Sequence, residues 1–257
     1  MKTKTLPVLP AFLLLTLSFS VAPVAWSQEV QAPAVLESFL CNYNDGKDYD
    51  DLMAARDFYV KQSSKAGITR QRAVLWQLYK GDVPFDFVWF NIHSNLGAFA
   101  ASSDAEIASA EMAAVGERFD KVAACSAGMG TVQIIHQPDA QQTPADNAFV
   151  SSSACRYRPG VGDADMSDLN NHISEVMKDM GDGAPDFAAA ISPFVGGPDT
   201  PDVVMFNVNQ NATQWANFVR ELVTKSPGQA LGRHFDALLD CRMSLFLSEE
   251  VVAVPQS

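Results

Sequence analysis

The sequence predicts an α+β protein that contains the same strand–helix–strand–strand–helix–strand unit twice. Two observations lead to this prediction. The two halves of the chain match each other, and each half alternates short apolar segments of strand type with amphipathic segments of helix type. The clearest match is between DFVWFNIHSN at residues 86–95 and DVVMFNVNQN at residues 202–211. Each copy begins as an apolar strand and ends in amide side chains.

The internal match extends beyond these two segments and includes the cysteines. At an offset of 116 positions it continues without a gap to residues 114–125, which match residues 230–241. Cys41 matches Cys155 at an offset of 114. A match of this length indicates the duplication of a unit of about 100 residues. The segment Gln137–Asn147 is rich in Pro, Gln and Asp and lacks apolar periodicity, so it predicts a linker.

Strands and helices are recognised within each unit by their apolar spacing. Val35–Tyr43 and Ala73–Tyr79 predict the first two strands of the first unit, and residues 86–95 predict the third. The helix between the first two strands is clearest in the second unit. There, Leu169–Met180 has apolar residues at helical spacing, and Gly181 stands just past its end.

The second helix of each unit has its own start signals. Glu106 follows Ser103 at the spacing of a capping box, and Pro227 is expected at the first helical position of the matching helix in the second unit. Four residues are expected to be helix N-caps: Asn95, Ser103, Asn211 and Ser226.

This order of elements, present twice, resembles the ferredoxin-like split βαβ arrangement. The mature chain resembles a tandem, single-chain version of the dimeric α+β barrel superfamily. The resemblance rests on the order of the elements. It implies two antiparallel sheets that face each other, with helices on their outer sides. The expected domains are a ferredoxin-like repeat at 28–136, a linker at 137–147 and a second ferredoxin-like repeat at 148–257.

The four cysteines predict disulfides. An even number suits an oxidising compartment, and the absence of a C-x-x-C motif argues against zinc or thioredoxin-like sites. In the fold that the chain resembles, the last strand lies antiparallel beside the first. The resemblance therefore implies the pairs Cys41–Cys125 and Cys155–Cys241, against the alternatives of free thiols or pairing across the repeats.

The N-terminus predicts export. Lys2 and Lys4 precede an apolar run, and small residues follow it up to Ser27, as in a cleaved signal peptide covering residues 1–27. A membrane anchor is the alternative, but the apolar run is shorter than the roughly 20 residues of a spanning helix. We expect a periplasmic or secreted bacterial protein without stable membrane insertion after cleavage.

The charge of the mature chain limits the classes of binding partner that are expected. Removing Lys2 and Lys4 changes the formal charge from −12 to −14. An acidic surface repels phosphates, so nucleic acid is not expected as a partner. A small molecule is the expected ligand.

The candidate site follows from the two faces of the third strand. Val88, Phe90 and Ile92 form an apolar face, which we expect to lie under the helices. The opposite face begins apolar, turns polar, and is expected to line a cavity between the two sheets. The expected ligand-binding residues are Trp89, Asn91, Met205, Asn207 and Asn209, and the candidate catalytic base is His93. Asn91 and Asn207 could instead tie the strand end to its neighbours, and His93 could be a structural histidine.

Four functions fit these features. The first is a periplasmic protein that binds a small, largely apolar molecule between the sheets. The second is a cofactor-independent oxygenase or isomerase, which the resemblance allows, with His93 as the base. The third is a non-catalytic envelope or assembly component. The fourth is a haem protein with His93 or His172 as the axial ligand.

No metal site or cofactor is expected from the sequence. No two histidines stand at metal-ligand spacing along the chain. His172 and His234, which takes the place of Arg118 in the second unit, are expected on the surface.

Overall fold

The computed structural model describes residues 33–68, 72–137 and 148–253 of the 257-residue chain. The expected signal peptide at 1–27 and residues 138–147 of the expected linker lie outside these ranges. The described residues belong to one compact unit, Ala32–Ser257. Among them, no helix has both the length and the apolar character that crossing a membrane requires.

The described ranges contain strands and helices in the predicted order. The strands are β1 (Ala34–Tyr43), β2 (Arg72–Lys80), β3 (Phe87–His93), β4 (Ala123–His136), β5 (Ala148–Tyr157), β6 (Phe187–Val195), β7 (Val203–Asn209) and β8 (Leu239–Ala253). The helices are α1 (Tyr49–Lys65), α2 (Leu96–Ala108), α3 (Ala110–Asp120), α4 (Asp163–Met180), α5 (Ala212–Thr224) and α6 (Ser226–Leu238), with a short 3-10 turn, η1 (Gly181–Gly183). The second helix of each repeat is split in two.

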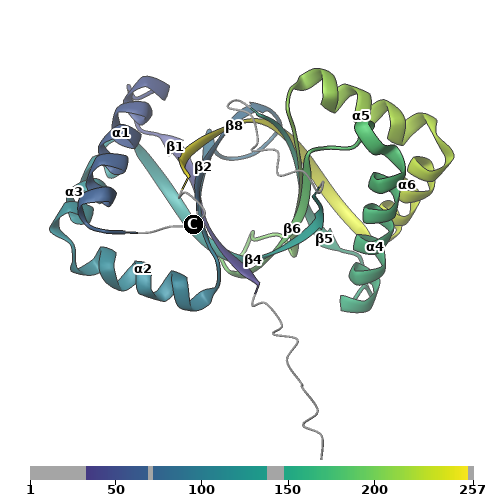
Figure 1. The fold of residues 1–257 in the computed structure, drawn as a ribbon, viewed down its shortest axis with the longest axis horizontal. Helices are drawn as coiled ribbons and strands as arrows, with labels where there is room; N and C mark the ends of the chain where they lie inside the picture. Colours follow the sequence, from purple (N-terminus) through teal and green to yellow (C-terminus); the bar gives the residue numbers. More distant parts are fainter. Residues whose placement is uncertain (1–32, 69–71, 138–147, 254–257) are drawn as a thin grey trace, which may run out of the picture. The chain divides into compact units, whose positions relative to one another are not determined.

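The strands form one closed antiparallel barrel in the order β1-β3-β2-β8-β5-β7-β6-β4. Within each repeat the last strand pairs with the first, β4 with β1 and β8 with β5. The two sheets meet along two seams, where β2 pairs with β8 and β4 pairs with β6. Helices α1–α3 lie outside one sheet and α4–α6 outside the other (Figure 1). The predicted pair of ferredoxin-like sheets is confirmed.

The long last strand of each repeat crosses its seam and reaches the helices of the other repeat. Gln133 on β4 accepts a hydrogen bond from Asn170 on α4 at 3.0 Å. At the position 116 residues later, Glu249 on β8 accepts a hydrogen bond of 2.8 Å from Tyr49 and forms an ion pair with Arg56 on α1. Each repeat therefore supplies a strand to the helical layer of the other.

The two faces of β3 are the reverse of the sequence prediction. Val88, Phe90 and Ile92 point into the barrel and pack with residues of both repeats. Phe87 and Trp89 lie instead under α1 and α3. The interior of an eight-stranded barrel is just wide enough for side chains to fill, and the apolar face of β3 helps to fill it here. The helix side can carry polar groups where the strand ends.

Trp76 on β2 fills the space in which the sequence predicted a ligand cavity. Its ring centroid lies 4.6 Å from that of Phe90, 5.1 Å from that of Phe206 and 5.8 Å from that of Phe246. These contacts connect strands of both repeats at the centre of the barrel. The predicted inter-sheet cavity is therefore wrong, because side chains occupy the barrel interior as a hydrophobic core.

The helix starts agree with the sequence prediction at two of four positions. Asn95 and Asn211 are N-caps, and each side chain accepts a hydrogen bond from a backbone N–H three residues on. Ser103 is not a cap, because it lies within α2 and its hydroxyl donates to the carbonyl of Phe99. The helix breaks six residues later, where Ser109 caps α3. In the second repeat the cap of α6 is Lys225, one residue before the predicted Ser226.

Both predicted disulfides are confirmed. Cys41 is bonded to Cys125 and Cys155 to Cys241, with a Cα–Cα distance of 4.1 Å in each case. The members of each pair are direct cross-strand partners, on β1 and β4 and on β5 and β8. Each repeat therefore has one covalent link between its first and last strands.

Replacing Cys41 and Cys125 by Ser is expected to lower the free energy of unfolding by roughly 4 kcal/mol, because the unfolded chain loses a long closed loop. Urea unfolding followed by circular dichroism measures the loss. The Cys155→Ser/Cys241→Ser variant is the matched comparison, since the sequence separations are 84 and 86 residues. A loss below about 1 kcal/mol in both variants would contradict the expectation.

Trp76→Ala is expected to destabilise the protein by about 3–5 kcal/mol, because it leaves a cavity at the centre of the barrel. The control is Ile107→Ala on α2, where the side chain is 86 % exposed and the change should stay within about 0.5 kcal/mol. Both values come from chemical denaturation. Equal effects of the two substitutions would show that Trp76 does not fill a packed core.

Candidate functional site

A chain of buried polar side chains lies on the helix side of the first repeat. Alternation along β3 places Trp89, Asn91 and His93 on one face, and Glu37 on β1 is the direct cross-strand partner of Asn91. The Trp89 Nε1–H donates to Asn91 Oδ1 at 3.0 Å, and Asn91 Nδ2 donates to Glu37 Oε2 at 3.2 Å. His93 Nε2 lies 2.9 Å from the same oxygen. We call these four residues the Glu37 cluster.

The direction of the hydrogen bonds in the Glu37 cluster is fixed by chemistry. An indole N–H can only donate, so the oxygen of Asn91 faces Trp89 and its amide nitrogen faces Glu37. The carboxylate accepts from both Asn91 and His93. With its Nε2–H donated to Glu37, a neutral His93 carries its lone pair on Nδ1. This is the arrangement by which a carboxylate orients a catalytic imidazole.

The Glu37 cluster is enclosed by aromatic side chains from three helices. The Trp89 ring makes edge contacts with Tyr59 of α1 at 5.3 Å and with Phe119 of α3 at 5.2 Å. The His93 ring lies edge-on to Phe99 of α2 at 5.5 Å. His93 is only 2 % exposed, whereas the Glu37 side chain is 19 % exposed. The cluster thus combines one acid–base pair with largely apolar walls.

The second repeat has a neutral version of the same cluster. Ser151 replaces Glu37, Asn207 replaces Asn91 and Asn209 replaces His93. The Ser151 hydroxyl and the Asn209 amide both donate to the oxygen of Asn207, at 2.8 and 3.1 Å. Met205, in the place of Trp89, packs under the helices of this repeat. A hydrogen-bonded Asn on the third strand is thus common to both repeats, while the ionisable pair is confined to the first.

The structure separates the predicted site residues into two groups. Trp89, Asn91 and His93 lie together in the first repeat, and Met205, Asn207 and Asn209 lie together in the second. Both groups face helices, and no single cavity is lined by all six. The sequence analysis missed Glu37, although it is the one charged residue within the apolar segment AVLESFLCNY of β1. The signal that could have identified Glu37 was a charged residue in an otherwise apolar strand.

Polar contacts that occur in both repeats are assigned a structural role, because the two repeats share the same fold. The backbone N–H of Tyr43 donates to Asp86 at 2.9 Å, and that of Tyr157 donates to Asp202 at 2.8 Å. Burial, followed by the charge of Asp86, raises the pKa of Tyr43 to about 12. Burial and the charge of Asp202 raise the pKa of Tyr157 in the same way. These pairs occur in both copies, unlike the Glu37–His93 pair.

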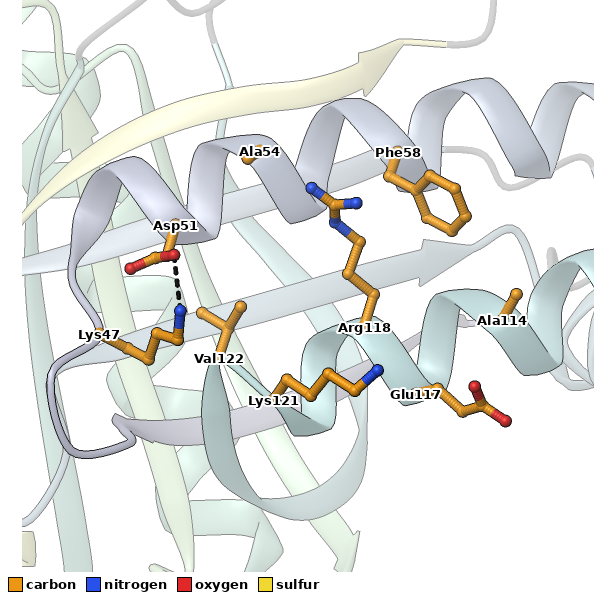
Figure 2. A pocket seen from close by; sticks show the side chains of 9 residues that line it. All are labelled: Lys47, Asp51, Ala54, Phe58, Ala114, Glu117, Arg118, Lys121 and Val122. Carbon is orange, nitrogen blue, oxygen red and sulfur yellow. Dashed lines mark hydrogen bonds and ion pairs between the residues drawn. The ribbon is translucent and has the colours of Figure 1, made fainter.

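A separate surface groove lies between α1 and α3 of the first repeat and has a volume of about 360 Å³. Figure 2 shows Lys47 hydrogen-bonded to Asp51 at its edge, and Arg118 reaching from α3 toward Phe58 on α1. The Arg118 guanidinium lies 5.1 Å from the centre of the Phe58 ring. Lys121 also lines the groove. This stack joins the two helices and leaves a shallow, mixed-charge surface.

The residues do not fit haem. An axial histidine needs space for a porphyrin beside its ring, whereas His93 is enclosed by Glu37 and Phe99. Nδ1 of His172, the other candidate, lies 3.1 Å from Nδ1 of His234. Among the described residues, no group of three or more His, Cys, Asp or Glu side chains is placed to hold a metal ion.

Comparison with known proteins identifies the fold. No protein-family model matches the sequence, and no curated protein matches it. A candidate monooxygenase from Fusobacterium nucleatum matches the structure with a TM-score of 0.56 and 10% identity, over 87% of this chain and 97% of its own. A candidate monooxygenase from Lactobacillus acidophilus matches with a TM-score of 0.53 and 14% identity, over 88% and 100%.

A candidate chlorite dismutase also matches, with a TM-score of 0.53 and 10% identity, over 86% of this chain and 96% of its own. Identities this low show a shared fold and leave the activity to the residues of each site. The chain therefore has the fold of the dimeric α+β barrel superfamily, with both ferredoxin-like repeats in one polypeptide.

Proposed function

We propose that this protein is an exported, cofactor-independent enzyme that removes a proton from a small hydroxyaromatic molecule at the Glu37 cluster. The observation that carries the proposal is the pair of buried His93 and partly exposed Glu37, with 2.9 Å between the carboxylate oxygen and Nε2. The second repeat supplies the comparison, since the same positions hold Ser151 and Asn209 there. A duplicated fold needs no acid–base pair at this position, so its presence in one copy supports a catalytic role.

The roles follow from the hydrogen bonds. His93 Nδ1 acts as the general base, while Glu37 orients the ring and stabilises the imidazolium that forms. Asn91 orients the Glu37 carboxylate by donating a hydrogen bond to it, and Trp89 orients Asn91 in the same way. The three aromatic rings around the cluster and the Trp89 ring within it offer stacking and edge contacts to a flat substrate, which favours an aromatic ring over an aliphatic chain.

Proton removal by a base can start two reactions, an oxygenation and an isomerisation. The ring-activated CH₂ group of a hydroxyaromatic substrate gives up a proton to His93, and the carbanion that forms shares its charge with the aromatic ring. Dioxygen adds to that carbon, the proton returns to form a hydroperoxide, and loss of water leaves a carbonyl. If the same anion is protonated at a different carbon, the reaction is an isomerisation. Two structural neighbours named as candidate monooxygenases support the oxygen-dependent form.

Helix α2 is proposed to control access to His93, because Phe99 on this helix contacts the His93 ring at 5.5 Å. Ser102 is its one buried residue, and Leu96 and Ile107 on the same helix are largely exposed. At the position that matches Ser102, α5 of the second repeat buries Phe218. The buried face of α2 therefore carries the small polar Ser102 where the buried face of α5 carries the large apolar Phe218. Substrate is expected to enter here when α2 moves outward.

Export is part of the proposal. The basic start and apolar run of residues 1–27 predict a signal peptide, and two disulfides suit an oxidising compartment.

His93→Gln is expected to lower turnover by roughly 10²- to 10⁴-fold, because Gln can still donate to Glu37 but cannot act as a base. Oxygen consumption with a panel of small hydroxyaromatic compounds measures the rate, and thermal unfolding checks the fold. The control is Asn209→Gln at the matching position of the second repeat, which should keep full activity. A His93→Gln variant that consumes oxygen at the wild-type rate would exclude His93 as the base. If compounds bind but none is turned over, the protein is a binding protein instead.

The double variant Glu37→Ser/His93→Asn rebuilds the polar cluster of the second repeat in the first. We expect this variant to fold and to be inactive. The single His93→Asn variant should be less stable than the double variant by about 1–3 kcal/mol, because it removes a hydrogen-bond donor from a largely buried carboxylate. Chemical denaturation compares the three proteins. Equal stability of the single and double variants would show that the Glu37–His93 bond contributes nothing to the fold.

A further inference from the structure

Two histidines that are far apart in the sequence meet between α4 and α6. His172 Nδ1 and His234 Nδ1 are 3.1 Å apart, and the ring centroids are 5.3 Å apart with 36° between the ring planes. Both side chains are half-buried. Two neutral imidazoles can share one proton at this distance, so one Nδ1 donates and the other accepts. The lone pair of the accepting nitrogen therefore points at its partner.

The first repeat has a different contact at the same place. Phe58 and Arg118 occupy the positions that match His172 and His234, at offsets of 114 and 116. Their ring-to-guanidinium contact of 5.1 Å fastens α1 to α3 (Figure 2). Helix packing at this point is therefore achieved without histidine. The imidazole pair occurs in the second repeat, and the fold does not require it.

We propose that His172 and His234 form a two-nitrogen binding site for a borderline transition metal ion such as Zn²⁺, Ni²⁺ or Cu²⁺. Imidazole is a preferred ligand of these ions. With metal–nitrogen bonds of about 2.0–2.1 Å, two nitrogens on one ion lie about 2.8–3.4 Å apart for bond angles of about 90–110°. The observed Nδ1–Nδ1 distance of 3.1 Å lies within this range. The metal takes the place of the shared proton.

The site has two protein ligands and open coordination positions. No cluster of three or more potential ligand residues occurs in the described ranges, so water or a small molecule completes the coordination. We therefore expect weaker binding than in a closed structural site. The formal charge of −14 after removal of residues 1–27 attracts cations to the protein. The half-buried position between two helices lets an ion enter from solvent and connect α4 to α6.

The test uses the tag-free mature protein with ZnCl2 and CuSO4. Isothermal titration calorimetry is expected to show one site, and thermal unfolding a higher Tm with metal. The matched variant is His172→Phe/His234→Arg, which installs the helix contact of the first repeat and removes both ligands. It should weaken metal binding at least about tenfold and abolish the metal-dependent rise in Tm. His136→Gln, which changes another histidine, should keep the wild-type response.

Two outcomes would overturn the proposal. One is the absence of binding heat and of any metal-dependent rise in Tm in the wild-type protein. The other is an undiminished metal response in His172→Phe/His234→Arg. Should that variant fail to fold, electron paramagnetic resonance of Cu²⁺ bound to the wild-type protein and to His234→Gln decides the question. Two coordinated imidazoles in the wild type and one fewer in the variant support the site, and identical spectra refute it.

Discussion

The packing of the barrel interior is the constraint on which the rest of the structure depends. Eight strands close around a space that side chains must fill, and Trp76 fills it by contacting Phe90, Phe206 and Phe246. Strands β2, β3 and β7 therefore give an apolar face to the centre of the interior. The polar side chains of Asn91, His93 and Glu37 lie on the outer side, under the helices. The location of the Glu37 cluster is a direct result.

The duplication makes it possible to distinguish structural roles from specialised ones. Features present in both repeats, such as the disulfides, the asparagine N-caps and the Asn on the third strand, maintain the fold. Features present in only one repeat are not required to maintain the fold. The Glu37–His93 pair occurs only in the first repeat, and the His172–His234 pair only in the second. Chemistry has thus diverged while the helices and strands have stayed the same.

The sequence predicted the order of the elements, the disulfides and two helix caps, because each depends on local patterns or on the internal match. It predicted the faces of β3 wrongly. Both faces are buried, so hydrophobicity could not tell the barrel interior from the layer under the helices. Trp76 was not singled out, although it alternates with Val74 and Leu78 on one face of β2. Contacts between side chains far apart in the chain, such as Glu37 with His93, depend on strand register, which the sequence pattern did not specify.

The contacts of each long strand with the helices of the other repeat have a consequence for the symmetry of the molecule. Gln133 meets Asn170 in one direction, and Glu249 meets Arg56 in the other, at matching positions. Such reciprocal contacts are those of a two-fold symmetric pair of identical subunits. In such a pair every substitution would appear twice, so an acid–base pair could not exist in one half alone. Because both halves belong to one polypeptide, a substitution appears once, and the Glu37–His93 pair can occur in one half alone.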